Sequence, residues 1–520
     1  MRKKYKIHIN GKPIQREYMV IPLRYIIALL IMIAEITAVI GIVVALCYYI
    51  PFFYLAALAT QVYCVVRIIA SDDNPDYKLP WLLFVLIIPI AGFMLYFMFY
   101  SRKLSSRYIK RMETMKSCAY HCDDSVAMQT LQNKNPVICA QAKMLKTISG
   151  ARVFTDTKQQ YLPLGEDMHR QMLIDLEKAV KFIYMEYFII EPGIFWDSIL
   201  EILKRKAAQG LEIKLLYDDI GCMALLPGNY FRSLRKYGIE AAPFSILRGN
   251  ADGEFNNRSH RKITVIDGKI GYTGGVNLAD EYINAVHPYG HWKDTGLRLE
   301  GDAVWELTRL FLVDFGMNVW KIPQQRNDLY PTVDIHESGW VIPFGDGPKP
   351  IYDRRVGKSV IQNMLSGAQR YVYMMTPYLI IDNDLCQSIE NAALRGIDVR
   401  IIVPHIPDKK IVFGMTRSYY PRLMAAGVRI FEYTPGFIHA KCYLCDDELA
   451  MIGTINLDYR SLVHHFENGV WMYQCRAIGS IAEDMHETLK ISTEITNEML
   501  KTSILQRMIR SLVRIFAPML

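Results

Sequence analysis

The sequence lacks a cysteine framework. Its ten cysteines are scattered over 520 residues, and no regular spacing points to a set of disulfides. Cys118 and Cys122 bracket a histidine, but no second pair follows that would complete a zinc site. Cys442 and Cys445 have the spacing of metal ligands, yet on a strand an odd separation directs them to opposite faces. The pattern excludes a disulfide-stapled scaffold and favours a reducing compartment.

Acidic clusters with the spacing of a Mg²⁺ or Zn²⁺ site are also missing from the sequence. We therefore expect neither a metal nor another cofactor. The formal net charge of +8 fits attraction to an anionic surface, to nucleic acid or to anionic substrates. The length is too great for one small core and predicts about three domains.

Apolar residues gather in the first hundred positions. Residues 25–49 carry one charge, Glu35, and as a helix they are long enough to cross a bilayer. Residues 51–66 are also apolar, and residues 81–100 carry no charge. The first run is too long for a cleavable signal peptide. We expect residues 1–104 to form a membrane region with two or three hydrophobic helices.

Basic residues flank this region on both sides, with six in residues 1–16 and six in residues 102–116. The positive-inside rule places both flanks in the cytoplasm, which requires an even number of crossings. Either the break at Pro51 makes one run dip and return, or the run broken by Pro89 and Gly92 is re-entrant. We expect two spans and a cytoplasmic body.

Beyond residue 150, strand-like and helix-like segments alternate, and the same plan occurs twice. The first copy has strands at 181–190 and 213–217 around a helix at 196–208; the second has strands at 370–375 and 399–403 around a helix at 385–394. This alternation predicts α/β layering, and the repeat predicts two homologous halves packed as a pseudo-dimer.

The expected domains follow from this repeat. Residues 105–150 form a connector, residues 151–345 the first lobe and residues 346–500 the second lobe. The proline-rich segment 321–350 joins the two halves.

Each half carries the same constellation of polar residues. The first half reads His260-x-Lys262-x4-Asp267-x6-Gly274-Gly275-x-Asn277, and the second reads His439-x-Lys441-x4-Asp446-x6-Gly453-Thr454-x-Asn456. Five matching positions at this spacing recur by chance in roughly one sequence in thousands. The duplicated constellation is the strongest functional signal in the chain.

The chemistry of these residues points to phosphate. A histidine and a lysine two apart on a strand share one face, where the imidazole can act as nucleophile or acid and the ammonium can neutralise a phosphate oxygen. The turns at Gly275 and Thr454 let backbone N–H groups approach an anion, and the amides of Asn277 and Asn456 add donors.

Asp267 and Asp446 complete the two predicted catalytic sets of histidine, lysine and aspartate. Their odd separation from the lysine puts them on the opposite face, so we expect each to tie its strand to the following turn. Two copies of the set explain a mechanism: one histidine attacks phosphorus while the other protonates the departing alcohol. The second histidine then deprotonates the incoming alcohol, and no metal is required.

The doubled motif resembles that of the phospholipase D superfamily, and the match extends to the bacterial cardiolipin synthases. Residues 79–100, 256–282, 291–304, 433–447 and 453–470 look like that group. The resemblance implies two phospholipase D-like α/β lobes forming a pseudo-dimer, preceded by transmembrane helices, with the site between the lobes. It also implies condensation of two phosphatidylglycerols into cardiolipin and glycerol, in the bacterial cytoplasmic membrane.

Further roles follow from the resemblance alone. An acidic residue from each half of the family's proteins steadies a catalytic histidine, often that of the other half. Glu467 and Asp294 occupy the matching places, so we expect Glu467 to pair with His260 and Asp294 with His439. The family's usual nucleophile is the first histidine, here His260.

Two features concern the approach to a lipid and to its acceptor. Residues 501–520 have helical apolar spacing with arginines on the other side, which is typical of a basic interfacial helix but also of a terminal helix packed on the body. His464 and His465 stand where the family more often has apolar residues and asparagine. This departure concerns acceptor preference rather than the chemistry.

Three other functions compete with lipid transfer. One is a phospholipase D-type hydrolase or a transferase that uses another alcohol, the second is a nuclease, and the third is a membrane scaffold with a degenerate site. The apolar N-terminus argues against a nuclease, and the two intact motifs argue against a scaffold. The expected partners are phosphatidylglycerol, cardiolipin and a bilayer, without nucleic acid, and a homo-oligomer is compatible with the sequence.

Overall fold

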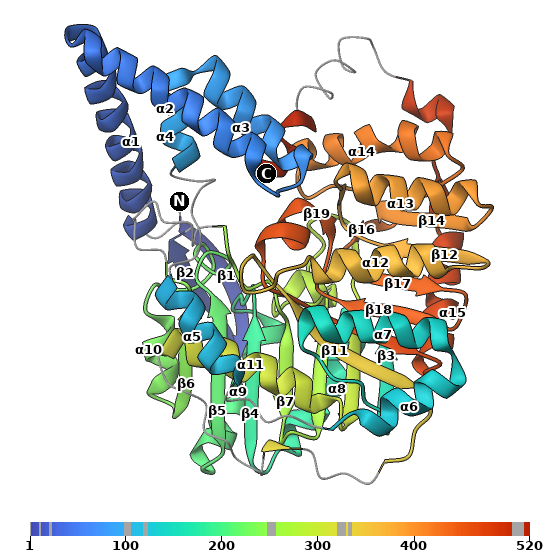
Figure 1. The fold of residues 1–520 in the computed structure, drawn as a ribbon. Coiled ribbons are helices and arrows are strands. Elements are labelled where there is room, and N and C mark those ends of the chain that lie inside the picture. The colour runs from blue at the N-terminus through green and yellow to red at the C-terminus, as the bar shows by residue number, and fades with distance from the viewer. Residues whose placement is uncertain are drawn as a thin grey trace.

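Two sheets with the same strand order form the body of the protein (Figure 1). The computed structural model describes residues 2–9, 12–19, 23–97, 106–117, 123–246, 256–319, 329–330, 335–501 and 514–519. The Cys118–Cys122 pair and residues 502–513 of the expected C-terminal helix lie outside these ranges, as do residues 321–328 and 331–334 of the segment expected to join the lobes.

The first sheet has seven strands in the order β3 (Thr157–Leu162), β10 (Gly296–Gly301), β8 (Ile270–Gly274), β7 (Ile263–Ile266), β4 (Phe182–Tyr187), β5 (Glu212–Asp218) and β6 (Ile239–Phe244). The second has β11 (Trp340–Asp346), β20 (Glu467–Tyr473), β18 (Leu449–Gly453), β17 (Cys442–Cys445), β12 (Tyr371–Met375), β14 (Asp398–Pro404) and β15 (Arg429–Tyr433), with β21 (Ser492–Glu494) added at the edge. The first seven positions correspond one to one, which confirms the predicted duplication.

The helices repeat as well. The first lobe contains α8 (Gly165–Glu177), α9 (Ile194–Ala208), α10 (Tyr230–Arg235) and α11 (Val304–Val319), and the second contains α12 (Val356–Gly367), α13 (Asn383–Leu394), α14 (Lys410–Ala425) and α15 (Ala477–Lys490). The helices expected at 196–208 and 385–394 lie within α9 and α13. β11 pairs with β20, so the sheet of the second lobe begins at Trp340, ahead of residue 346 where the sequence places the start of that lobe.

One hydrophobic core is shared by both lobes. It contains Leu299 and Phe311 from the first lobe and Ile452 and Ile481 from the second, all fully buried. Each lobe has a further core on the other face of its sheet. Cys442 belongs to the shared core and Cys445 to the separate core of the second lobe, so the two thiols lie on opposite faces of β17 as expected. The shared core fixes the lobes against each other.

The N-terminal part contains a hairpin of β1 (Arg2–Ile9) and β2 (Lys12–Met19), which the sequence analysis does not predict, and then α1 (Leu23–Tyr49), α2 (Pro51–Ala70), α3 (Pro75–Ile87) and α4 (Pro89–Leu95). Within the described residues, α1 and α2 are long and apolar enough to cross a membrane, over Leu29–Leu46 and Phe52–Ala70. The protein buries 0% of the first window and 11% of the second, so both expose apolar side chains. Figure 1 shows this pair of helices projecting from the body.

The third apolar run breaks at Pro89, where α3 ends and α4 begins. Trp81, Val85 and Tyr96 from this run pack on Cys64 and Ile68 of α2. The run therefore folds back on α2 instead of forming one long helix.

The segment expected as a connector is part of the body. α5 (Ser106–Ser117) packs along α11, whereas α6 (Ser125–Lys134) and α7 (Pro136–Ser149) cover the second lobe. Leu131 and Leu145 are buried in the same core as Ile361 of α12. Residues 105–150 thus stabilise the second lobe as well as leading to the first.

Candidate active site

Two short parallel pairings between the lobes hold the duplicated motifs face to face. β16 (Gly436–Ile438) of the second lobe pairs with β9 (His291–Lys293) of the first, and Ser259 forms an isolated parallel bridge with Phe466. The backbone N–H of His439 donates to the carbonyl of Lys293 at 2.7 Å, and that of His260 donates to Phe466 at 2.8 Å. In both cases the hydrogen bond sets a histidine of one lobe beside the residue that directly follows its bonded partner in the other lobe.

That following residue is an acid in both cases. Nδ1 of His260 lies 2.9 and 3.0 Å from the two carboxylate oxygens of Glu467, and Nδ1 of His439 lies 2.6 Å from Oδ2 of Asp294. Both carboxylates are fully buried, and each histidine is 7% exposed. These are the two contacts that the resemblance implies. Since each carboxylate accepts a hydrogen bond from Nδ1–H, Nε2 is the ring nitrogen left to react.

The two lysines are buried beside the histidines. Lys262 donates to the carbonyl of His260 at 2.7 Å, and Lys441 Nζ lies 2.8 Å from Nδ1 of His439 and donates to the carbonyl of that residue. The histidine–lysine segments precede β7 and β17 rather than lying within them, because these strands begin at Ile263 and Cys442. Their side chains still converge on one site.

Burial governs the titration of these groups. Desolvation, aided by the charges of Lys262 and Lys441, lowers the pKa of His260 well below its usual value. Desolvation and Lys441 lower the pKa of His439 to about 4, although Asp294 opposes the shift. Desolvation also lowers the pKa of Lys262 to about 7 and that of Lys441 to about 8. The free site therefore holds neutral imidazoles, and each histidine feels the lysine of the other lobe.

Gly275 and Thr454 support the acids rather than presenting N–H groups to an anion. A Cβ on Gly275 would lie 2.0 Å from Oδ1 of Asp294, so only glycine leaves room for that carboxylate. The hydroxyl of Thr454 donates to Glu467. Both backbone N–H groups are already bonded across the sheet, to Thr295 at 3.0 Å and to Asn468 at 2.9 Å. The expected anion-binding turns thus position the carboxylates instead.

The two asparagines bond mainly to the protein. Asn277 accepts from the backbone of Ile189 at 3.0 Å and donates to the Tyr282 hydroxyl at 2.7 Å. Asn456 donates to Asp458 at 2.9 Å, and its buried Oδ1 has no partner within the described residues. One amide N–H of each residue is therefore committed to the fold.

Asp267 and Asp446 do not belong with the histidines, which corrects their place in the predicted catalytic sets. Asp267 accepts backbone N–H groups at 2.7–2.9 Å from Val180, Lys181 and Phe182, and Asp446 accepts at 2.7–2.8 Å from Gln369, Arg370 and Tyr371. Both have positive φ, 53° and 56°, in the turn after the strand. Each carboxylate ties the end of its strand, β7 or β17, to the neighbouring strand. That end lies away from the histidines, which precede the start of the same strand.

Sequence reasoning missed the residues that surround the imidazoles. Phe188 packs edge-on against His260 with ring centroids 5.2 Å apart, and Tyr282 does the same against His439 at 5.3 Å. Arg261, one residue after His260, is buried against Asp314 at 2.5 Å and donates to the carbonyl of Glu467 at 3.0 Å. The odd offset of Arg261 from His260 predicts only that the two side chains point to opposite sides of the extended chain.

Comparison with known proteins assigns these features to a family. The sequence model described as "Cardiolipin synthase, PLD-like domain" matches residues 172–287 and 361–489, and one described as "Phospholipase D-nuclease N-terminal" matches residues 60–99. The cardiolipin synthase of Geobacillus sp. (strain WCH70) is 32% identical over 480 residues, which make up 90% of this chain and 94% of that protein. This chain belongs to the cardiolipin synthase family.

Other relatives agree in length and alignment. A cardiolipin synthase of Halalkalibacterium halodurans is 30% identical over 467 residues, covering 89% of this chain and 92% of that one. A Streptococcus mutans protein described as uncharacterized is 40% identical over 468 residues, covering 88% and 99% of the two chains. Among solved structures, phosphatidylserine synthase of Haemophilus influenzae aligns with a TM-score of 0.56 at 16% identity, over 74% of this chain and 98% of that one. That likeness supports the two-lobed fold.

A further buried histidine, His465, lies beside the site. The ring of His465 lies 5.6 Å from that of His260, and its Nδ1 lies 3.9 Å from Oε1 of Glu467. This Nδ1 is buried without a hydrogen-bond partner in the described part of the chain. Ligand atoms of His260, His465 and Glu467 lie within 4.8 Å of one another, so these three residues could hold a metal ion, although the sequence leads us to expect none.

Proposed function

We propose that this protein is a cardiolipin synthase that transfers a phosphatidyl group from one phosphatidylglycerol to another and releases glycerol. The transfer proceeds through a phosphohistidine on His260. The observation that carries the proposal is the crossed pairing of His260 with Glu467 and of His439 with Asp294. Each carboxylate fixes Nδ1–H of its imidazole and so presents the lone pair of Nε2 to a phosphorus between the lobes.

In the first step, Nε2 of His260 attacks the phosphorus of the donor lipid. The bond from phosphorus to the glycerol headgroup oxygen breaks, and His439 gives its proton to that oxygen. Glycerol leaves, and the phosphatidyl group stays on His260. His439 is now neutral and can act as a base.

In the second step, His439 takes the proton from the primary hydroxyl of a second phosphatidylglycerol. The resulting oxygen nucleophile attacks phosphorus, and the bond to His260 breaks. Cardiolipin forms, His260 returns to its neutral form, and His439 again carries the proton. Phe188 and Tyr282 flank the two rings and help keep water from the phosphohistidine.

The charges balance around a bound phosphodiester. Its single negative charge would lie between Lys262 and Lys441, the two buried ammonium groups of the site. An anion there favours the charged forms of both lysines and of His439. The proton that His439 needs for the first step is therefore taken up as the lipid binds, because burial keeps its pKa near 4 in the free site.

The same proposal extends to the membrane. α1 and α2 cross the bacterial cytoplasmic membrane, α3 and α4 fold back as a re-entrant segment, and both lobes face the cytoplasm. Its supports are the apolar exposed faces of α1 and α2, the break at Pro89 and the basic residues that flank the region. The packing of α3 on α2 keeps the lobes at the membrane surface.

Product analysis tests this function. Purified full-length protein given phosphatidylglycerol as the sole lipid, with EDTA present, is expected to make cardiolipin and glycerol in equal amounts. Phosphatidic acid as the main product would instead identify a hydrolase. Dependence on an added divalent metal would contradict the metal-free mechanism. Adding phosphatidylethanolamine to the same assay measures the range of acceptors.

A further inference from the structure

Two loops, one from each lobe, touch each other beside the strand pair β9 and β16. Residues 284–290 lead into β9, and residues 405–409 join β14 to α14. The backbone N–H groups of His405 and Ile406 donate to the carbonyl of Gly436 in β16 at 3.2 and 3.3 Å. A Cβ added to Gly290 would lie 3.2 Å from Cδ1 of Ile406, so the loops are in van der Waals contact. Residues 285–290 and 405–411 are called the rim.

The rim exposes apolar side chains to solvent. Ile411 is 70% exposed, Val286 47% and Ile406 38%. Ala285 and Pro288 are exposed as well. Single exposed apolar residues are common on any protein, but these five belong to two touching loops. Their transfer from water into the boundary layer of a bilayer would be favourable.

The charge of the rim is positive. Its titratable groups are two lysines, two histidines and one aspartate: Lys409, Lys410, His287, His405 and Asp408. Both lysines are exposed, and neither forms an ion pair within the described part of the chain. Outside the rim, the buried carboxylate of Glu432 contacts His405 at 3.1 Å but is also paired with Arg417 at 2.9 Å. The two lysines are therefore free to bind an anionic surface.

The rim lies on a defined edge of the second lobe. β12 and β14 are neighbouring parallel strands, so the segments that follow them leave the same edge of the sheet. The segment after β14 is the rim loop 405–409, and the segment after β12 leads to the start of α13. The rim and the start of α13 thus share one edge.

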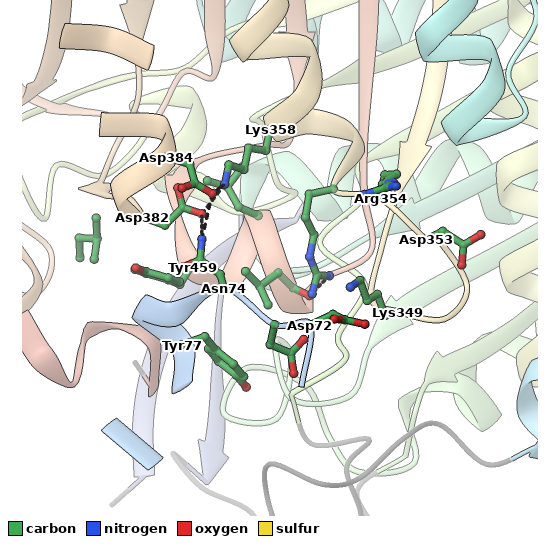
Figure 2. Close-up of a pocket in the computed structure, with 15 residues that line it drawn as sticks. Asp72, Asn74, Tyr77, Lys349, Asp353, Arg354, Lys358, Asp382, Asp384 and Tyr459 are labelled. Atoms are coloured by element: carbon green, nitrogen blue, oxygen red, sulfur yellow. Dashed lines mark hydrogen bonds and ion pairs between the residues drawn. The ribbon is translucent and has the colours of Figure 1, made fainter. Parts of the chain in front are cut away.

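The N-terminal helices are fastened to that edge. The amide of Asn74, in the loop between α2 and α3, donates to Asp382 before α13 at 2.9 Å (Figure 2). A cavity of about 300 Å³, lined in part by Asp72 and Asp353, borders this contact. The candidate span of α2 ends at Ala70, four residues before Asn74. With α2 in the bilayer, the membrane surface therefore passes along the edge that carries the rim.

Aromatic side chains connect the rim to the active site. The ring of Tyr289, which is half-buried, lies 6.0 Å from that of Phe437 and 6.3 Å from that of Trp292. These two rings lie 6.0 and 5.4 Å from the ring of His439. The apolar surface that begins at the rim thus continues to the imidazole proposed to serve the alcohol.

We propose that the rim is a second membrane-contact surface of this protein, and that its partner is an anionic bilayer. Val286, Ile406 and Ile411 insert at the boundary between headgroups and acyl chains, while Lys409 and Lys410 bind lipid phosphates. The rim holds the edge of the active site against the leaflet that supplies the lipid. This inference deepens the proposed function and rests on it for the placement of α2 in a membrane.

Fluorescence quenching tests the contact directly. A fluorescent non-natural amino acid is placed at Ile411, or at Leu394 as the control, in full-length His260→Ala protein, which leaves the lipid unchanged. Both positions are 70% exposed, and Leu394 lies at the other end of α13. In nanodiscs of phosphatidylglycerol and phosphatidylcholine, a doxyl group on the acyl chain near the glycerol backbone should quench the probe at 411 and leave the probe at 394 bright. Equal quenching at the two positions, or none at 411, would overturn the proposal.

The two lysines have their own matched control. Lys409→Gln with Lys410→Gln should reduce the quenching at 411 to the level measured in nanodiscs of phosphatidylcholine alone. Lys178→Gln with Lys181→Gln removes equal charge from exposed positions before β4 and should leave the quenching unchanged. Equal quenching in the two double variants would overturn the role of Lys409 and Lys410.

Activity separates membrane contact from a damaged fold. In the otherwise wild-type protein, Ile411→Asp should lower the rate of cardiolipin formation from bilayer phosphatidylglycerol about tenfold. It should leave the rate with monomeric dihexanoyl-phosphatidylglycerol unchanged, and Leu394→Asp should affect neither rate. An equal loss with both lipids would overturn the proposal. A chain that makes cardiolipin without quenching at 411 refutes the rim alone, and a chain that shows the quenching but makes no cardiolipin refutes the proposed function alone.

Discussion

The carboxylate of Glu467 lies 2.9 Å from Nδ1 of His260, although the two residues are 207 positions apart and belong to different lobes. The reciprocal contact joins Asp294 to His439 across 145 positions. Neither lobe therefore contains a complete histidine–carboxylate pair of its own. The pseudo-dimer is a requirement of the site, because only the packed lobes orient both imidazoles.

Replacing Glu467 with glutamine should lower kcat for cardiolipin formation about 10²–10⁴-fold, with little change in KM. The amide no longer holds a negative charge beside the imidazole, and it can donate to Nδ1, which favours the wrong tautomer. Steady-state kinetics with phosphatidylglycerol measure the effect. Glu487→Gln, at an exposed position of α15, is the matched control and should be neutral. An equal loss in the control, or a pure KM effect in Glu467→Gln, would contradict the role.

The pH dependence of kcat/KM should be bell-shaped with an optimum between about 4 and 7, because the first step needs protonated His439, whose pKa in the free site is about 4, together with ionised Glu467. Burial raises the pKa of Glu467 to about 7, so its carboxylate forms as the pH rises to that value. Burial lowers the pKa of Lys262 to about 7 and that of Lys441 to about 8, so the charges that bind phosphate are lost as the pH rises further. The alkaline limb of kcat should lie at higher pH than that of kcat/KM, because bound lipid stabilises both ammonium groups. A flat kcat/KM up to pH 9.5 would contradict this assignment.

Asp267→Ala should destabilise the fold without removing the chemistry. The change breaks three hydrogen bonds from backbone N–H groups and puts alanine at a φ of 53°. A loss of about 3 kcal/mol is expected, which lowers the unfolding midpoint in detergent by roughly 6–12 °C. Asp267→Asn keeps an acceptor and tolerates that φ, so its midpoint should fall less. Inactive Asp267→Ala protein with an unchanged midpoint would restore this residue to the catalytic set.

Zinc should inhibit the enzyme, whereas EDTA should not. The ligand atoms of His260, His465 and Glu467 lie within 4.8 Å of one another, and Zn²⁺ held there would occupy the nucleophile. His465→Asn removes one ligand and should raise the zinc concentration for half-inhibition at least tenfold. Zinc binding measured by competition with a chromogenic chelator should weaken in parallel. Equal inhibition of both proteins would show that this cluster does not bind the metal, and activation by zinc would contradict the metal-free mechanism.

The sequence predicted the repeat well because the repeat is local. Buried apolar strands followed by amphipathic helices identify β4, α9 and β5 in one lobe and β12, α13 and β14 in the other. The spacing of His260 and Lys262 likewise predicts that their side chains meet at one site. The contacts of Asp294 and Glu467 came from resemblance, since nothing in either local sequence says which residue a strand of the other lobe will meet.

Features that depend on packing between distant segments were missed or misread. α6 and α7 look like a connector, but Leu131 and Leu145 are buried in the core of the second lobe. Gly275 was expected to expose its N–H to an anion, yet its lack of a Cβ makes room for Asp294. The cavity lined by Asp72 and Asp353 also escaped notice, because these two residues are about 280 positions apart in the chain.

The identity of the phosphorylated residue tests the central claim most directly. Full-length protein mixed with phosphatidylglycerol and quenched in alkali, which preserves phosphohistidine, is digested and examined by mass spectrometry. We expect a phosphatidyl group on His260 in the wild-type protein, more of it in His439→Ala supplied with a donor that has a good leaving group, and none in His260→Ala. An adduct on His439, or cardiolipin formed by His260→Ala at the wild-type rate, would contradict the account.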